Sequence, residues 1–122
     1  MIWKDIEGFE NYQVSNTGRI RCKERKVSQV SRFGGRYERT IRSREMKLQF
    51  NADGYHIICL CVENKSHTKR VNRLVAEAFI DNPENKPVVN HKDLNKTNNN
   101  SNNLEWVTVM ENTHHYWKNK KK

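Results

Sequence analysis

Alternating apolar and polar residues predict a small β unit at the start of the chain. The segment Gln13-Val14-Ser15 leads into a turn signal, Asn16-Thr17-Gly18, and residues 19–23 then alternate between basic and apolar side chains. Because successive side chains of a strand point to opposite faces, the cations of this run share one face. They are Arg19, Arg21 and Lys23, and the apolar cluster behind them is expected to contain Trp3, Ile6, Phe9, Tyr12 and Val14.

Hydrophobic patterning weakens over residues 27–45 and then returns. This segment lacks a clear period and contains Gly34-Gly35, which predicts a loop or an irregular hairpin that orders on a partner, with disorder as the alternative. Runs of β-forming residues between turn signals predict a hairpin or meander over residues 46–71. A helix is predicted over residues 72–80, because one face would collect Val71, Leu74, Val75, Ala78 and Phe79.

The last third of the chain predicts the order strand, loop, strand, helix. A short strand is expected over residues 88–91, followed by an Asn-rich loop from 95 to 103, since Asn suits tight irregular loops. The second strand should be anchored by Leu104, Trp106 and Val107. Thr108 and Glu111 form a capping box, which predicts that a helix begins there and runs through Trp117.

Composition and charge indicate a polyanionic partner. With 122 residues, 34% of them hydrophobic and 30% charged, the chain has room for one compact domain or two small modules. The net charge is +9, and residues 19–47 alone hold eleven Lys or Arg against three Glu. Four further lysines stand in the tail 118–122. Such a concentration suits phosphates, and the alternative is a solvated basic loop.

The cysteines and the hydropathy exclude several classes of protein. Cys22, Cys59 and Cys61 are odd in number and include no C-x-x-C pair, which argues against a disulfide framework and a cysteine zinc ribbon. Cys59 and Cys61 are expected as buried free thiols on one face of a strand. No apolar run approaches the ~20 residues that span a bilayer, so a soluble protein of the cytoplasm is expected, with no membrane partner.

Three polar residues in the last third make a candidate site for phosphodiester hydrolysis. His91 ends the predicted strand, Asn103 follows the loop, and Asn112 lies in the first turns of the last helix. A neutral imidazole can take a proton from water, and an amide oxygen can bind a hard cation such as Mg²⁺. A structural histidine is the alternative for His91. His115, one turn further along the helix, is the alternative metal ligand.

Two blocks of residues resemble a known family. The first contains Trp3-Lys4-Asp5-Ile6-Glu7-Gly8-Phe9 and Tyr12-Gln13-Val14-Ser15-Asn16-Thr17-Gly18-Arg19-Ile20-Arg21. The second contains Val71-Asn72-Arg73-Leu74-Val75-Ala76-Glu77-Ala78-Phe79, Asn90-His91-Lys92-Asp93 and Asn103-Leu104-Glu105-Trp106-Val107-Thr108. Together they resemble phage and intron-encoded HNH homing endonucleases of the variant whose last motif residue is Asn, with a NUMOD4-like N-terminal module.

The resemblance implies an α+β fold in two parts. Residues 1–45 would form a small β module that binds DNA, and residues 46–122 would form an HNH nuclease core of the ββα-metal type. The function implied is metal-dependent cleavage of double-stranded DNA, leaving a 5′-phosphate and a 3′-hydroxyl. One site per chain favours nicking, by a monomer or a homodimer. The alternative function is that of a phage DNA-binding accessory protein with a degenerate site.

The resemblance also assigns roles to residues. His91 would be the general base, with Asn103 orienting it or tying the loop to the strand. Asn112 and Asn90 would hold a divalent ion, Mg²⁺ or alternatively Mn²⁺. Asn90 stands where many relatives carry an Asp that shares the metal, which should weaken metal affinity; Asn72 stands where relatives often carry His. DNA contacts are expected from Arg19, Arg21, Lys23, Arg25, Arg36, Arg39, Arg42 and Arg44.

Overall fold

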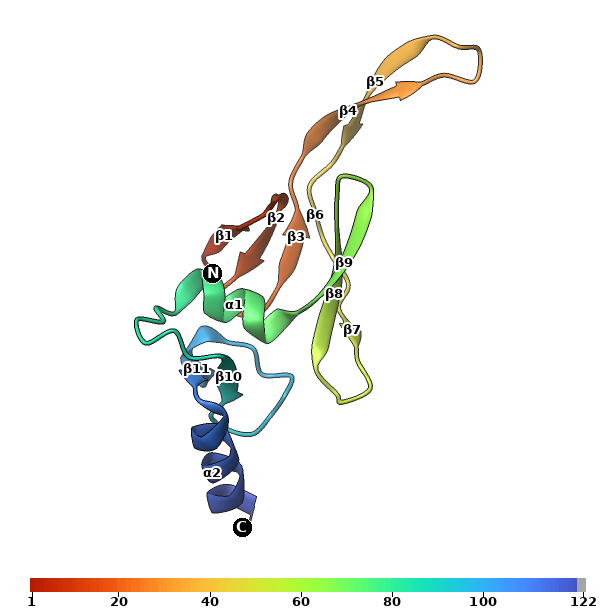
Figure 1. Cartoon of the computed structure of the whole chain (residues 1–122). Helices are drawn as coiled ribbons and strands as arrows, with labels where there is room; N and C mark the ends of the chain where they lie inside the picture. Colours follow the sequence, from red (N-terminus) through yellow and green to blue (C-terminus); the bar gives the residue numbers. More distant parts are fainter. Residues whose placement is uncertain (121–122) are drawn as a thin grey trace.

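The computed structural model describes residues 1–120, and strands make up most of its regular structure (Figure 1). Two helices accompany them, α1 (Val71–Phe79) and α2 (Val109–Lys120). This mixed, strand-rich architecture agrees with the predicted α+β class. Neither helix of the described part is long and apolar enough to cross a membrane. The last two lysines of the predicted basic tail lie outside the described residues.

The N-terminal residues form a four-stranded sheet with the order β1-β2-β3-β6. The strands are β1 (Trp3–Ile6), β2 (Phe9–Ser15), β3 (Ile20–Cys22) and β6 (Arg44–Glu45). Four of the five residues expected in the apolar cluster pack into or against the core. The prediction for Trp3 is wrong, because its ring lies on the opposite face beneath Arg21, 4.2 Å from the guanidinium carbon to the ring centroid.

A turn between β2 and β3 brings the N-terminal sheet against the C-terminal loop. Gly18 adopts a φ of +90°, and a Cβ at this position would lie 2.7 Å from the Cβ of Asn99. Only glycine tolerates both the conformation and the close approach. In addition, the backbone N–H of Ser101 donates to the carbonyl of Asn16 at 2.8 Å. The N-terminal module therefore supports the Asn-rich loop directly.

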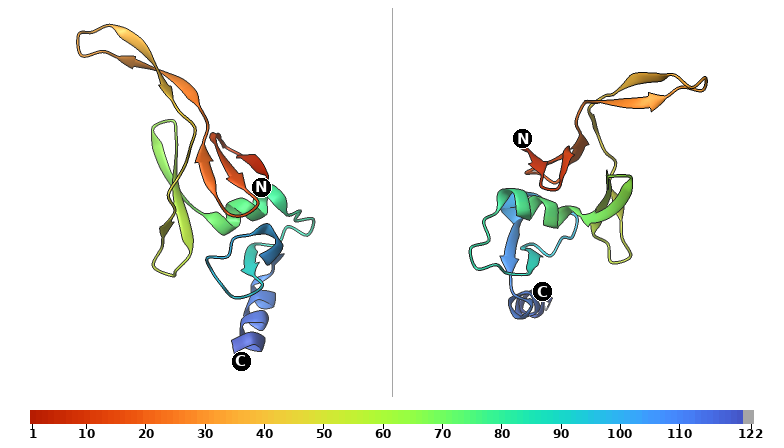
Figure 2. Two further views of the ribbon diagram at one scale, coloured as in Figure 1. Left: turned by 180° about the vertical axis from the view of Figure 1, so that it is seen from behind. Right: turned by 45° about the horizontal axis from the view of Figure 1, so that its top comes forward.

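A hairpin of β4 (Arg25–Val30) and β5 (Arg36–Ile41) projects from the rest of the molecule (Figures 1 and 2). Its two strands pair over six consecutive residues without a register shift. It is thus a regular hairpin, rather than the loop or irregular hairpin that the sequence predicted. Most of its side chains are exposed, so neither face of the hairpin packs against a core. The alternation of apolar and polar residues that predicts a half-buried strand is therefore missing from its sequence.

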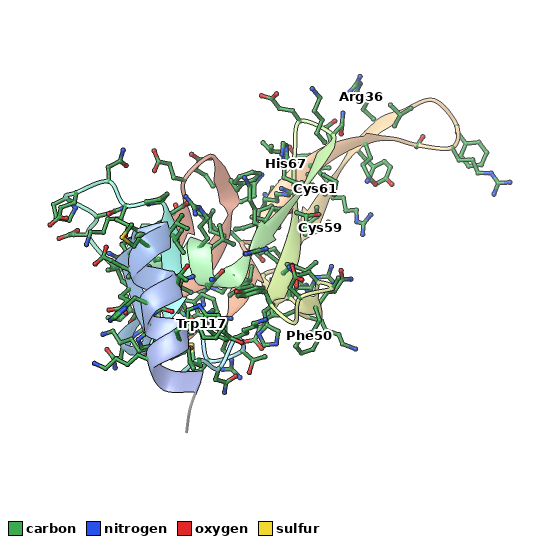
Figure 3. All side chains as sticks on the ribbon, turned by 60° about the horizontal axis from the view of Figure 1, so that its bottom comes forward. Arg36, Phe50, Cys59, Cys61, His67 and Trp117 are labelled. Atoms are coloured by element: carbon green, nitrogen blue, oxygen red, sulfur yellow. The ribbon has the colours of Figure 1, made fainter. Side chains whose placement is uncertain are left out.

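The next segment is a three-stranded meander, as predicted, with β7 (Gln49–Phe50), β8 (His56–Val62) and β9 (Lys65–Arg70). Ile58 and Leu60 of β8 are buried in the core. Cys59 and Cys61 share the other face of β8 and are exposed, so the prediction of buried thiols is wrong (Figure 3). The larger aliphatic side chains take the core face because they remove more apolar surface from water.

Helix α1 lies at the centre of the fold and joins both halves of the chain. Its apolar face agrees with the predicted one: Val71, Leu74 and Val75 are buried, and Ala78 and Phe79 pack against them. The core that surrounds this face takes residues from both sides of the predicted division at residues 45 and 46; it contains Ile6, Tyr12, Val14 and Ile20 together with Ile58, Leu60 and Leu104. The division into two domains stays a prediction.

The C-terminal segment has the predicted order of elements. Strand β10 (Val88–His91) pairs antiparallel with β11 (Leu104–Val107), and the 3-10 turn η1 (Ser101–Asn103) precedes β11. Helix α2 then begins with the expected capping box, in which the Glu111 backbone N–H donates to the Thr108 hydroxyl at 3.1 Å and the Thr108 N–H donates to the Glu111 carboxylate at 2.9 Å.

Candidate functional site

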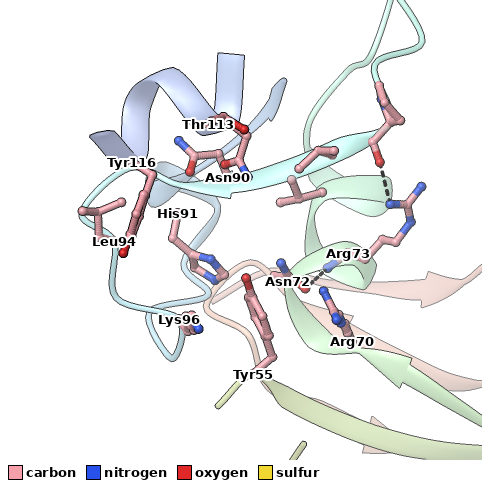
Figure 4. A pocket seen from close by; sticks show the side chains of 14 residues that line it. Tyr55, Arg70, Asn72, Arg73, Asn90, His91, Leu94, Lys96, Thr113 and Tyr116 are labelled. Atoms are coloured by element: carbon pink, nitrogen blue, oxygen red, sulfur yellow. Dashed lines mark hydrogen bonds between the residues drawn. The ribbon is translucent and has the colours of Figure 1, made fainter. Parts of the chain in front are cut away.

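A pocket of about 550 Å³ runs along the edge of β10 that does not pair with β11 (Figure 4). Its walls come from the end of β9, the first turn of α1, strand β10, the Asn-rich loop and α2. Three cations line it, and no Asp or Glu does. The charged and polar residues of its lining are Tyr55, Arg70, Asn72, Arg73, Asn90, His91, Lys96, Asn112, Thr113 and Tyr116. The pocket therefore suits an anion.

His91 is held at the end of β10 by a hydrogen bond to the Asn-rich loop. The residue is 5% exposed, and its Nε2 lies 2.8 Å from the Oδ1 of Asn99. The other end of that amide, Nδ2, lies 3.5 Å from Nδ1 of His56 and donates to it. Since Asn99 Oδ1 can only accept, Nε2 of His91 carries the proton and Nδ1 is left as the basic nitrogen.

The surroundings of His91 keep its imidazole neutral. Burial is the largest effect and lowers its pKa below the ordinary value of 6.5, while the hydrogen bond to Asn99 raises it in part. Asp93 raises the pKa and Lys96 lowers it, each by its charge. The imidazole ring also lies 5.9 Å from the ring of Tyr55, measured between centroids. A buried, neutral and oriented imidazole has the properties that a general base requires.

Asn103 ties the loop to the strand. Its Nδ2 donates to Oδ1 of Asp93 and to the carbonyl of Asn98, both at 2.9 Å. Its Oδ1 accepts from the backbone N–H of Asp93 at 3.2 Å, and its carbonyl accepts from the N–H of Lys92. None of these bonds reaches His91. Of the two roles considered from the sequence, the geometry favours the second, and the side chain that contacts His91 is Asn99.

The two residues expected to hold a metal, Asn90 and Asn112, line the same pocket. The Nδ2 of Asn90 donates to Glu105 at 2.9 Å, which leaves its Oδ1 for the pocket. Amide oxygens are hard donors that suit Mg²⁺. The described residues contain no cluster of three or more His, Cys, Asp or Glu that would hold an ion by themselves. The donors therefore fit a divalent cation in kind, completed by water or by a phosphate.

The alternative ligand, His115, is placed differently. Its Nε2 lies 3.0 Å from the carbonyl of Lys92, so this nitrogen donates a proton there. His115 is also outside the lining of the pocket, whereas Asn112, Thr113 and Tyr116 of the same helix belong to it. Of the two candidates on α2, the geometry thus favours Asn112.

Seven of the eight expected DNA-binding cations fall into two groups, and Arg25 differs from both. The three on or beside β3 have partners within the sheet: Arg19 pairs with Glu45 at 3.1 Å, Lys23 with Asp5 at 3.2 Å, and Arg21 donates to Gln13 at 2.8 Å. The Nε of Arg25 is buried without a hydrogen-bond partner among the described residues. The side chains of the other four form no hydrogen bond or ion pair with the described part of the chain; they are Arg36, Arg39, Arg42 and Arg44.

The hairpin cations and the pocket lie on different parts of the molecule. Figure 1 shows the β4–β5 hairpin projecting at the top of the molecule, whereas β10 and α2, which line the pocket, lie toward the bottom. A partner that touches both must be extended, and a duplex of nucleic acid is such a partner.

Comparison with protein families identifies the N-terminal half of the chain. The family described as the NUMOD4 motif matches residues 1–61, which is half of the chain. The chain belongs to the NUMOD4 family. Its N-terminal sheet and projecting hairpin are thus the NUMOD4 part of the structure, and the match extends beyond the predicted module of residues 1–45 into β8.

Relatives of this NUMOD4 chain are HNH endonucleases. The DNA endonuclease I-HmuI of Bacillus phage SP01 is 44% identical over 110 residues, which cover 88% of this chain and 53% of the relative. An uncharacterized HNH endonuclease of Acanthamoeba polyphaga mimivirus is 42% identical over 113 residues, which cover 93% of this chain and 29% of the relative. The chain thus spans about half of the length of these relatives, or less.

A solved structure has the same fold. The structure of DNA binding and cleavage by the HNH homing endonuclease I-HmuI superimposes with a TM-score of 0.78 at 39% identity. The superposition covers 100% of this chain and 61% of that one. Similarity at this level extends to the whole described architecture, including the C-terminal strands and helix.

Sequence reasoning missed Tyr55, which lines the pocket, and also Asn99 and Glu105, which contact residues of its lining. Asn99 is one of a run of asparagines, and nothing in the sequence distinguishes it as the partner of His91. The contact of Glu105 with Asn90 depends on the register between β10 and β11, and the irregular loop between these strands does not predict that register. The ring of Tyr55 contacts two cations from elements far apart in the sequence: the guanidinium carbon of Arg70 lies 4.4 Å and Nζ of Lys96 lies 4.9 Å from its centroid.

The hydrogen bond between His91 and Asn99 predicts a pH effect. Replacing Asn99 by Asp keeps an acceptor and adds a negative charge, which stabilises the imidazolium and raises the pKa of His91. We expect the pKa of His91, followed by NMR titration, to rise by about one unit or more. In the unaltered protein this pKa should lie below 6.5, because burial lowers it.

The neighbouring substitution Asn100→Asp is the control for this experiment. The Asn100 side chain accepts from the backbone N–H of Asn102 and begins η1, and Asp is an equally good cap. It adds the same charge to the same loop without touching His91. A pKa of His91 that rises equally in both variants would show that charge at a distance, rather than the direct hydrogen bond, sets it.

Proposed function

We propose that the protein is a metal-dependent DNA endonuclease that hydrolyses one phosphodiester bond at a time in double-stranded DNA. The observation that supports it most is the environment of His91. Its Nε2 is fixed by Asn99 at 2.8 Å, its Nδ1 is free to accept a proton, and the pocket beside it is lined by three cations. The similarity to HNH endonucleases supports the same conclusion.

The residues take the following roles in this proposal. His91 accepts a proton from the attacking water through Nδ1. Strands β10 and β11 with helix α2 act as a ββα unit, and the amide oxygens of Asn90 and Asn112 would hold a divalent cation, Mg²⁺ in the first place. That cation would stabilise the negative charge on the phosphate and the leaving oxygen. Asn103 keeps the loop, and hence Asn99, in place.

The remaining cations of the pocket serve the substrate. Arg70 lines it from the end of β9, Arg73 from α1 and Lys96 from the loop. Each has a protein partner, Asp53 for Arg70, Glu77 for Arg73 and the Asp53 carbonyl for Lys96, which it would exchange for a phosphate oxygen. Beyond the pocket, the projecting hairpin would track the duplex with its unpaired arginines. We retain the division into a DNA-binding module, residues 1–45, and a nuclease part, residues 46–122, as part of this proposal. The active form is a monomer or a homodimer.

A supercoiled plasmid provides the direct test. With Mg²⁺ or Mn²⁺, the protein should convert it to the relaxed circle before any linear form accumulates, because one site cuts one strand. DNA ligase should seal the product if the nick carries a 5′-phosphate and a 3′-hydroxyl. EDTA should abolish the conversion. A protein that binds the plasmid but leaves it intact at every concentration of both ions would be an accessory DNA-binding protein instead.

A further inference from the structure

Glu105 touches the residue that stands where relatives carry a metal-binding aspartate. Asn90 on β10 and Glu105 on β11 lie directly opposite each other in the antiparallel register. The Asn90 Nδ2 donates to Oε1 of Glu105 at 2.9 Å. Because a carboxylate can only accept, it selects which end of the amide turns toward it. The oxygen end of Asn90 is thereby turned away from Glu105.

The side-chain oxygen of Asn90 is available to the pocket. Asn90 is 5% exposed and lines the pocket together with Asn112, and its Oδ1 has no hydrogen-bond partner among the described residues. An acceptor of this kind, open to the pocket and without a protein partner, can bind an ion or a water. The negative charge of Glu105 also polarises the amide and makes its oxygen a better donor to a cation.

The other carboxylates near this site are engaged elsewhere. Asp93 accepts hydrogen bonds from Asn95, Asn98 and Asn103 within its own loop. Glu111 caps α2 and pairs with Lys86 at 3.1 Å. Of these three carboxylates, Glu105 is the one that contacts a candidate ligand of the metal.

We propose that Glu105 is a positioning residue of the divalent-cation site. It holds the amide of Asn90 with the oxygen toward the cation, and it supplies from β11 the negative charge that an aspartate at position 90 would supply from β10. This inference rests on the proposed metal dependence of the site. It also changes the expectation for Asn90→Asp, which the sequence alone predicts to strengthen metal binding.

Variants that move the carboxylate from position 105 to position 90 separate the orientation of the ligand from its charge. Asn90→Asp alone removes the donor and places two carboxylates across the 2.9 Å contact, so their repulsion opposes the gain of a charged ligand. Asn90→Asp with Glu105→Gln restores a donor facing an acceptor, because the new amide at position 105 can donate to the new carboxylate. The double variant has the same net charge as the unaltered protein and only moves the carboxylate to the other strand.

The affinity for Mn²⁺, measured by electron paramagnetic resonance or calorimetry on the full chain, tests the proposal without DNA cleavage. We expect Glu105→Gln to weaken Mn²⁺ binding by about 10–100-fold, as for other residues that orient a ligand. The double variant should restore the affinity at least to its original level, and Asn90→Asp alone should fall short of the double variant. Thermal unfolding of each variant reports any loss of fold separately.

Glu84→Gln is the matched control. Glu84 lines the same surface depression as Glu105 and pairs with Lys86 at 3.5 Å, but it does not touch Asn90. Its substitution should leave Mn²⁺ affinity unchanged. The role of Glu105 would be wrong if both variants lost the same Mn²⁺ affinity. It would also be wrong if Glu105→Gln lost none in a protein that binds Mn²⁺ and nicks DNA, and in that case the proposed function would still stand. An unaltered protein that binds no Mn²⁺ would overturn this inference, and the plasmid assay would then decide the proposed function separately.

Discussion

Replacing His91 by alanine is expected to lower the rate of plasmid nicking by about 10²–10⁴-fold, the usual cost of removing a general base. The imidazole is the basic group whose proton-free nitrogen remains available in the pocket, since Nε2 is bound to Asn99. DNA affinity should change little, because the expected DNA contacts are made by cations elsewhere. Nicking rates at saturating protein and binding measured without metal separate the two effects.

Two further measurements decide between a catalytic and a structural His91. The control His67→Ala removes a half-buried histidine of β9 that contacts Phe9 of β2 outside the pocket, and it should leave nicking unchanged. Imidazole added to the His91→Ala variant should restore part of the lost rate, since the deletion leaves space for it. A variant that has lost its cooperative thermal unfolding, and that imidazole does not rescue, would show that His91 serves the fold.

The elements around this histidine could be predicted because their signals are local. The bounds of β10 and the start of α2 follow from a β-rich tetrapeptide and a capping box, both of which depend on neighbouring residues. The buried face of α1 likewise follows from its 3.6-residue period. Candidate residues that sit on such elements, His91 and Asn112, were therefore placed in one pocket from the sequence.

Contacts that depend on tertiary packing could not be predicted in this way. Asn99 becomes the partner of His91 because Gly18, 81 positions earlier, leaves room for its Cβ. Glu105 meets Asn90 through a register that the twelve residues between His91 and Leu104 do not encode as a regular turn. The regular β4–β5 hairpin was missed for a different reason, since a hairpin without a buried face has no hydrophobic period.

Replacing Arg36, Arg39 and Arg42 by glutamine should weaken DNA binding and reduce the slope of log K against log salt by about 2.7, since each lost phosphate contact removes ~0.9. These side chains are exposed and have no partner among the described residues, so nothing in the protein competes with phosphate for them. Fluorescence anisotropy with a labelled duplex, repeated over a range of salt concentrations, gives the slope.

The matched comparison is the triple replacement of Arg19, Arg21 and Lys23 by glutamine. It removes the same charge, so the long-range attraction between protein and DNA falls equally in both variants. These three cations, however, are held by Glu45, Gln13 and Asp5, and each must leave its partner to reach a phosphate. We therefore expect a smaller change of slope than for the hairpin. Equal slopes would show that the contacts of β3 open on DNA, and that the basic face predicted from the sequence binds the duplex as strongly as the hairpin does.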